Sequence, residues 1–220
     1  MAEFTESRFI LCEGMDDKCF LEALIREHHL PSFQICHAAE FNGRGIGESS
    51  TGGKDGFKTA LDRVDVLSGF DNLKAILIVT DNDEPKSLKK LRQSLKGIGS
   101  VPQSVTEVGT IYGKPLAVFL IPSATECGDL ETFCLPEIHK VWPRSPRCVE
   151  DFLTNTGALN WTKQSSINKA RARAAVVGFY QPDPYMGIGY LFRKGQLSVK
   201  NQRFDALVDF LRKFDTFAGI

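Results

Sequence analysis

Acidic residues that follow predicted strands are the groups in this chain best suited to chemistry. Three apolar runs end in carboxylates: Glu13 follows Arg8–Cys12, Asp81 and Asp83 follow Lys74–Thr80, and Glu126, Asp129 and Glu131 follow Pro115–Ile121. Because the carboxyl ends of parallel strands meet at one edge of a sheet, we expect these side chains to converge. Two carboxylates about 4 Å apart repel by about 4 kcal/mol at an effective dielectric near 20. The sequence therefore predicts that a divalent cation, or protonation, relieves the repulsion.

The kind of cation follows from the ligands. Oxygen ligands without His or Cys favour Mg²⁺ or Mn²⁺. Simpler explanations stay open for each acid taken alone. Asp16 and Asp17 open a predicted helix, where acids interact favourably with the helix dipole, and Asp81-Asn82-Asp83 is compatible with an ordinary turn. The arrival of acids at three successive strand ends is what favours a functional site.

Strands and helices alternate along the first two thirds of the chain. Strand-like runs at 8–12, 33–39, 74–80 and 115–121 alternate with helical patterns at 15–29, 54–67, 87–95 and 130–139. Continuously apolar strands are typical of a parallel sheet that is covered on both faces. Further on, helices are expected at 167–177 and 204–214, separated by a Pro/Gly-rich connector at 181–189. We predict an α/β fold, with a mostly parallel sheet flanked by helices over residues 1–140. A helical C-terminal extension, residues 141–220, is expected to pack on it.

Composition and charge narrow the class of protein. The 220 residues are 42% hydrophobic and 25% charged, which suits one well-filled core. The longest apolar runs, of five and six residues, are far below the roughly 20 that a membrane helix needs. The first nine residues show no secretory signal, and six cysteines without a Cys-x-x-Cys pair predict free thiols. We therefore expect a soluble, cytoplasmic protein that does not contact a membrane.

Basic residues are unevenly distributed. The chain has 27 acids and 27 bases, but residues 1–84 carry 16 acids and 8 bases, and residues 161–220 carry 4 acids and 10 bases. Two basic segments, Lys86–Lys96 and Lys169–Arg173, would suit the neutralisation of phosphates beside an acidic site. A solvated helix face explains them equally well.

Lys54 is a further candidate for phosphate contact and catalysis. It follows Gly52-Gly53 at a predicted helix start, where backbone N–H groups and a lysine can meet a phosphate. The segment is not a Walker A loop, because Glu48 stands where that motif needs Gly and Asp55 where it needs Ser or Thr. A plain surface loop is the alternative interpretation.

The acidic motifs resemble those of a known family. Glu13-Gly14-Met15-Asp16-Asp17 is similar to the Glu-Gly-x-x-Asp signature of Toprim domains, and Asp81-Asn82-Asp83 to their Asp-x-Asp signature. Gly128-Asp129-Leu130-Glu131 looks like the additional acidic motif of OLD-type (overcoming lysogenization defect) Toprim nucleases and of related small Toprim families. The resemblance covers about residues 8–135. Glu84-Pro85 departs from the residues common in primases, no zinc module precedes the motifs, and the chain is too short for a topoisomerase. These departures favour a nuclease-like member.

The resemblance implies a metal-dependent nuclease that acts on DNA or RNA with Mg²⁺ or Mn²⁺. The metal ligands that it implies are Glu13, Asp81 and Asp83, with Asp17 and Glu131 or Asp129 completing a second site. Glu13 would alternatively act as general base or acid. The cations would bridge the scissile phosphate, activate a water and stabilise the leaving oxygen. Because OLD-type proteins often work with an ATPase and this chain has no ATPase motif, a separate P-loop ATPase partner is implied, with a role in phage defence.

Two other classes of function stay open. One is another phosphoryl-transfer enzyme. Haloacid dehalogenases also use Asp-x-Asp, but their second Asp is normally followed by x-Thr, whereas Glu84-Pro85 follow here. Receiver domains use an acidic pair, a strand-end Asp and a Lys. The other class is a non-catalytic module that binds nucleic acid or a partner through a metal-stabilised surface. The sequence leaves the number of subunits open.

Overall fold

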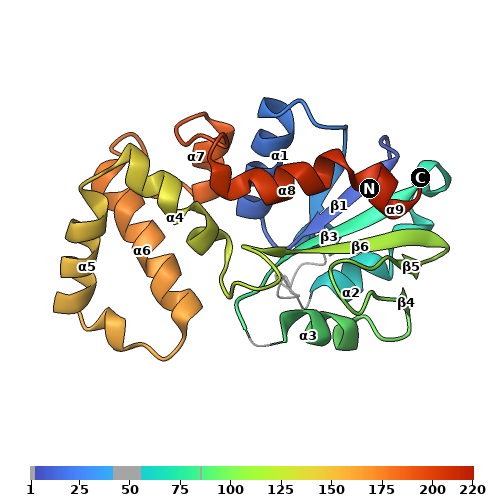
Figure 1. The fold of residues 1–220 in the computed structure, drawn as a ribbon, viewed down its shortest axis with the longest axis horizontal. Helices are drawn as coiled ribbons and strands as arrows, with labels where there is room; N and C mark the ends of the chain where they lie inside the picture. Colours follow the sequence, from blue (N-terminus) through green and yellow to red (C-terminus); the bar gives the residue numbers. More distant parts are fainter. Residues whose placement is uncertain (1–2, 42–55, 85) are drawn as a thin grey trace, which may run out of the picture.

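The computed structural model describes residues 3–41, 56–84 and 86–220 (Figure 1). Within them, six strands form one sheet in the order β2-β1-β3-β6-β5-β4. The strands are β1 (Arg8–Cys12), β2 (Gln34–His37), β3 (Ala75–Asp81), β4 (Gly99–Ser100), β5 (Gly109–Ile111) and β6 (Lys114–Ile121). Strands β2, β1, β3 and β6 run parallel to one another, and β5 is antiparallel to both β6 and β4. The predicted α/β fold with a mostly parallel sheet is confirmed.

Helices occupy most of the remaining described chain. The α-helices are α1 (Met15–Glu27), α2 (Gly56–Leu61), α3 (Ser87–Ser94), α4 (Leu130–Val141), α5 (Ser145–Asn155), α6 (Gln164–Phe179), α7 (Ile188–Arg193), α8 (Asp205–Arg212) and α9 (Phe214–Ala218). Short 3₁₀ turns are η1 (Ala38–Phe41), η2 (Val64–Val66), η3 (Phe70–Asn72), η4 (Ala158–Asn160) and η5 (Gln202–Phe204). No helix among the described residues is long and apolar enough to cross a membrane.

The sheet is buried on both faces. All seven residues of β3 are buried, and alternate side chains enter two separate hydrophobic clusters: Leu77 and Val79 enter one, and Ile76 and Ile78 the other. The first cluster is covered by α1, α7 and α8, and the second by α2 and α3. Figure 1 shows these two groups of helices on opposite sides of the sheet. This double cover is the reason for the continuous apolar runs that the sequence shows.

The C-terminal helices pack against the rest of the chain at two places. α8 and α9 lie along the sheet, and an ion pair between Arg8 of β1 and Asp215 of α9 ties the end of the chain to it. α5 and α6 pack on α4 and on each other instead, beyond the strand ends (Figure 1). The helical C-terminal region is therefore present as predicted, and its first half reaches the edge where the acidic residues lie.

Candidate functional site

The ends of β1 and β3 place Glu13 against Asp81. The two strands are parallel neighbours, with Cys12 in register with Val79. The Glu13 carboxylate oxygen Oε1 accepts a hydrogen bond of 2.9 Å from the backbone N–H of Asp81 and one of 2.5 Å from the hydroxyl of Thr80. Residues 68 positions apart in the chain thus meet through the parallel register, as the strand-end argument predicted.

Asp129 and Asp81 are joined at the start of α4. Asp81 is 8% exposed, and its Oδ1 accepts from the backbone N–H of Leu130 at 3.1 Å. Asp129 is fully buried, and its Oδ1 caps α4 by accepting from the backbone N–H and the hydroxyl of Thr132. Its other oxygen, Oδ2, is buried without a hydrogen-bond partner in the described residues. Since buried polar atoms are normally hydrogen-bonded, this oxygen is suited to an additional ligand.

Asn82 holds the loop between β6 and α4 against the acidic turn. Its side-chain Nδ2 donates to the carbonyl oxygens of Ser123 and Glu126 at 3.0 Å each. Its backbone carbonyl accepts from Gly128 at 2.9 Å. Sequence reasoning treated Asn82 only as the variable residue of Asp-x-Asp, and the structure assigns it this positioning role.

Asp17 belongs to the same group of acids. It lies in the first turn of α1, where its Oδ2 accepts from the backbone N–H of Gly14 at 2.9 Å. Burial, followed by the charge of Glu13, raises the pKa of Asp17 to about 8. Burial also raises the pKa of Asp81 well above its usual value, with the charges of Asp17 and Glu13 adding to the effect. Asp17 thus caps the start of α1 and also contributes to the repulsion among the acidic side chains.

Glu131 and Lys169 complete the surroundings. Burial raises the pKa of Glu131, and the charge of Lys169 on α6 opposes the rise. For Lys169, burial acts to lower the pKa, but the charges of Glu131, Asp81, Asp129 and Glu13 outweigh it and the pKa is raised. The structure therefore gathers five predicted site acids at one edge and adds a lysine from the C-terminal region. That group consists of Glu13, Asp17, Asp81, Asp129 and Glu131, and we call it the acidic edge.

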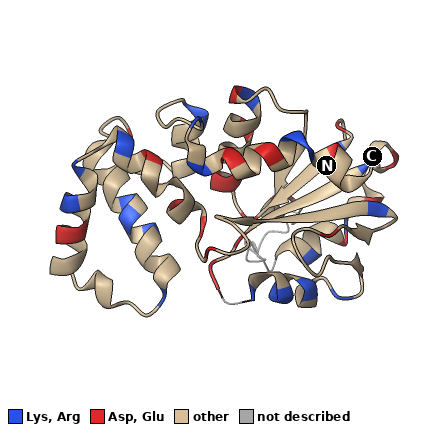
Figure 2. Cartoon of the chain, viewed as in Figure 1, with Lys and Arg blue, Asp and Glu red and all other residues tan. Residues whose placement is uncertain are grey.

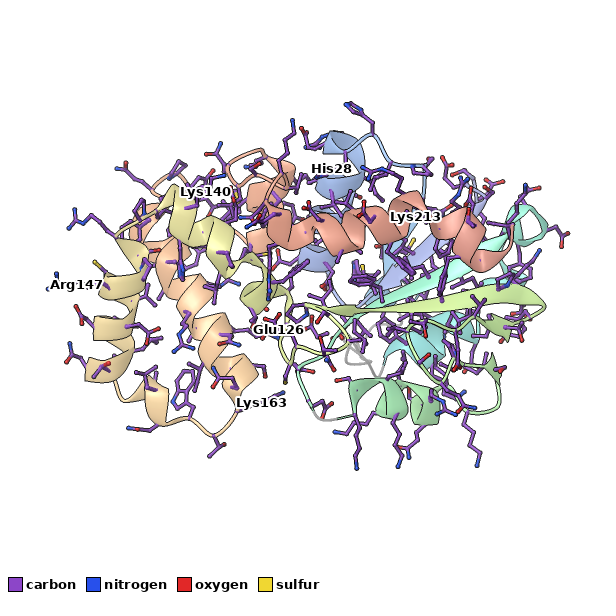
Figure 3. The ribbon with its side chains drawn as sticks, in the orientation of Figure 1. His28, Glu126, Lys140, Arg147, Lys163 and Lys213 are labelled. Atoms are coloured by element: carbon purple, nitrogen blue, oxygen red, sulfur yellow. The ribbon has the colours of Figure 1, made fainter. Side chains whose placement is uncertain are left out.

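The other acids of the motifs have different surroundings. Asp83 is 14% exposed, and Lys163 Nζ lies 3.9 Å from its Oδ2. Asp16 accepts from the backbone N–H of Gly189 at 3.1 Å and so caps α7. Glu126 forms an ion pair with Arg203. Figure 3 labels Glu126 and Lys163 where the C-terminal helices approach the strand ends. Lys54 lies outside the described residues.

The acidic edge supplies a donor set that suits a hard cation, but its side chains are not arranged as ligands. Across residues 3–41, 56–84 and 86–220, no three His, Cys, Asp or Glu side chains form a ready metal-binding group. Oxygens of Glu13, Asp17 and Asp81 instead accept from backbone N–H groups. The all-oxygen donors and the unpartnered Asp129 Oδ2 fit Mg²⁺ or Mn²⁺, and binding would require at least one of the other carboxylates to turn.

Comparison with known proteins gives a family for this chain. The family described as "Protein of unknown function (DUF3226)" matches residues 7–215. The chain belongs to this family. No curated protein and no solved structure matches the chain. The DUF3226 match includes the whole sheet, the acidic edge and α6. Lys169 and the acids that it faces therefore all lie within the matched region.

Proposed function

We propose that this DUF3226 protein is a nuclease that requires Mg²⁺ or Mn²⁺ and hydrolyses phosphodiester bonds of DNA or RNA. The observation that carries the proposal is the acidic edge, where five acids from the ends of β1 and β3 and the starts of α1 and α4 lie close together. Burial, followed by the charge of Glu13, raises the pKa of Asp17 there to about 8. Such crowding is costly unless a cation binds there or a carboxyl group holds a proton. Sites of this kind lie at the carboxyl ends of parallel strands in α/β folds.

The roles of individual residues follow from their positions. Asp81, Asp129 and Glu13 are the proposed ligands of one cation, because Asp81 and Asp129 meet at the start of α4 and Glu13 contacts the Asp81 backbone. Asp17 and Glu131 would serve a second cation, and Asp83 would join the first from the same turn as Asp81. Bound cations of this type activate a water and stabilise the charge that develops on phosphate oxygens.

Lys169 and Glu13 supply the remaining chemistry. The Lys169 ammonium faces the acidic edge from α6 and would pair with a non-bridging oxygen of the scissile phosphate. Glu13, if it is not a ligand, would take the proton of the attacking water, since its carboxylate lies beside the Asp81 backbone. Lys54 stays a proposed phosphate contact on sequence grounds.

The motif resemblance extends the proposal. Similarity to OLD-type Toprim nucleases supports a separate P-loop ATPase as partner, a role in phage defence and a cytoplasmic location. Affinity purification from the native host tests the partner: co-purification of a P-loop ATPase supports it, and purification of the chain without one counts against it.

The activity is tested with a panel of substrates. Supercoiled DNA, single-stranded DNA, structured RNA and tRNA are incubated with Mg²⁺, with Mn²⁺ or with EDTA. We expect metal-dependent cleavage of at least one substrate, and a loss of at least about 100-fold in Glu13→Gln and Asp81→Asn, since each removes a charge that the metal site needs. Asp151→Asn is the matched control, because Asp151 is 69% exposed on α5.

The outcomes separate the classes of function. Cleavage by both site variants at the wild-type rate would refute the proposed roles. Metal-dependent binding of nucleic acid without any product would instead support the non-catalytic module. Trapping of an acyl phosphate on Asp81 would favour the phosphoryl-transfer alternative.

A further inference from the structure

We propose that a basic groove between α3 and β4 binds the sugar–phosphate backbone of nucleic acid outside the acidic edge. The identity of the bound polymer rests on the proposed function, whereas the groove itself rests on separate residues. A cavity of about 400 Å³ lies between the two elements, and Lys89, Arg92 and Lys96 are among the side chains that line it. Gln93 and Ser100 add polar groups, and no acidic residue lines the cavity. We call it the α3 groove.

Lys89 and Arg92 lie on one side of α3, and Lys96 follows in the turn just after its end. Lys89 and Arg92 are three residues apart, the spacing of one helix face, and all three cations are exposed. Leu91 and Leu95 are buried beneath them in the second hydrophobic cluster. Like charges at this spacing destabilise a helix by a few tenths of a kcal/mol per pair. A bound anion would remove that cost.

The charges of the groove are not compensated by acids. In the part of the chain that the structure describes, Lys89, Arg92 and Lys96 form no ion pair, whereas neighbouring Lys90 pairs with Glu84. The sequence from Lys86 to Thr106 contains no Asp or Glu at all. Figure 2 shows the blue residues of α3 next to the red turn that ends β3. A basic surface therefore directly follows the acidic edge along the chain.

The dimensions of the groove suit one strand of nucleic acid. At 1.5 Å per helical residue, Lys89 and Arg92 are about 4.5 Å apart along α3, and Lys96 lies in the turn beyond the end of the helix. One strand of duplex DNA carries a phosphate about every 3.4 Å along the helix axis, so Lys89 and Arg92 are spaced to contact neighbouring phosphates and Lys96 would contact a further one. A protein partner fits less well. Lysine is depleted in protein interfaces, and no aromatic side chain lines the cavity.

The test measures binding in the absence of metal, so that cleavage plays no part. Fluorescence anisotropy follows a labelled 30-nucleotide single strand and a 30-base-pair duplex in EDTA across a range of salt. The variant carries Lys89→Gln, Arg92→Gln and Lys96→Gln. The matched control carries Lys194→Gln, Lys200→Gln and Lys213→Gln. These three exposed lysines lie directly after α7, between α7 and η5, and between α8 and α9. Circular dichroism melts establish that both variants are folded.

We expect the groove variant to lose about three phosphate contacts. The slope of log K against log salt should then fall by about 2 for the single strand, and the affinity at 0.1 M salt by about 100-fold. The control should bind like the wild type. Wild-type affinity in the groove variant, an equal loss in the control, or no binding by the wild-type protein would each overturn the proposal.

The two proposals fail in different ways. A wild-type protein that binds nucleic acid through the α3 groove but cleaves nothing with Mg²⁺ or Mn²⁺ would refute the nuclease and leave the groove standing. A protein that cleaves DNA or RNA while the groove variant binds normally would refute the groove and leave the nuclease standing.

Discussion

The pKa of Asp17 predicts that the metal-free protein loses stability as the pH rises. Burial and Glu13 raise this pKa from 3.8 to about 8, so the folded protein holds a proton that the unfolded chain releases above about pH 4. The resulting stabilisation is complete below the unfolded pKa and is lost as the pH rises through about 8. Between these limits one proton is worth about 1.4 kcal/mol per pH unit. From pH 5 to pH 7 the loss from this group amounts to about 3 kcal/mol.

The Asp17→Asn variant removes this contribution, together with the charge by which Asp17 raises the pKa of Asp81. Asparagine keeps an oxygen that can accept from the Gly14 N–H but carries no charge. The stability of the variant minus that of the wild type should therefore rise by about 3 kcal/mol between pH 5 and pH 7. For a domain of this size, that corresponds to about 6–12 °C in melting temperature. His37 and His139, whose pKa values are lowered by burial, give the opposite trend. They are present in both proteins, so their effect cancels in the difference.

The assay is urea unfolding followed by circular dichroism in EDTA at several pH values, with Asp151→Asn as control. The control should run parallel to the wild type because Asp151 is exposed. A difference between Asp17→Asn and wild type that does not change with pH would refute the raised pKa of Asp17. Adding Mg²⁺ should stabilise the wild type more at pH 7 than at pH 5, since a cation binds the deprotonated carboxylates.

Further predictions concern the framework around the site. Gly189→Ala should destabilise the protein by at least about 1–3 kcal/mol in chemical unfolding, because an added Cβ would lie 1.9 Å from the backbone oxygen of Asp16. Asn82→Ala should cost about 1–3 kcal/mol and slow any metal-dependent cleavage, since it removes the donors that hold the loop after β6. Asp215→Asn should cost less than about 1 kcal/mol at neutral pH, because its pair with Arg8 is partly exposed. Arg8 lowers the pKa of Asp215, so this contribution is present above about pH 4 and is lost as the pH falls; acid titration of both proteins should show the difference vanishing.

The part of the fold that the sequence predicts well is the part set by local pattern. The strand predicted at 74–80 from its continuous apolar character corresponds to β3, Ala75–Asp81, which is fully buried and central. Once neighbouring strands are parallel, their ends must share an edge, and this brings Glu13 to Asp81 without further information. The sequence does not predict the edge strands β4 and β5, because strands of two and three residues are too short to show an alternation of apolar and polar residues.

The parts that the sequence could not predict depend on distant contacts. The start of α7 was expected to be a connector, and its helix is capped by Asp16, which lies 173 residues away. Glu126 looked like a site acid, and its ion pair with Arg203 spans 77 residues. The predicted helix at 54–67 ends at Leu61 and gives way to a 3₁₀ turn. Helix α5 was missed because its apolar residues are few, and one of them, Phe152, is exposed.

Within the site, the role of Lys169 also depends on distant contacts and could not be predicted from the sequence. It lies in a basic segment with Arg171 and Arg173, and nothing in the spacing distinguishes the three. In the structure Arg171 pairs with Glu150, and Arg173 donates to backbone carbonyls of the connector. Lys169 is the member of the segment whose pKa is raised by the acidic edge. Whether a basic side chain takes part in a site therefore depends on the group that it contacts, and not on its position in a basic segment.

The charges of the acidic edge are more than the fold itself requires. Asp17, Asp81 and Asp129 each accept hydrogen bonds from a helix start, a contact worth about 1 kcal/mol. Asparagine or serine would make a similar contact without charge. Beyond the effect of burial, the charges of Asp17 and Asp129 instead raise the pKa of Asp81, and the fold must oppose the repulsion whenever these groups are ionised. Helix capping accounts for side-chain oxygens at these three positions but not for their negative charges. A bound cation would account for both the oxygens and their charges. For this reason the arrangement favours a cation site over a purely structural role for these acids.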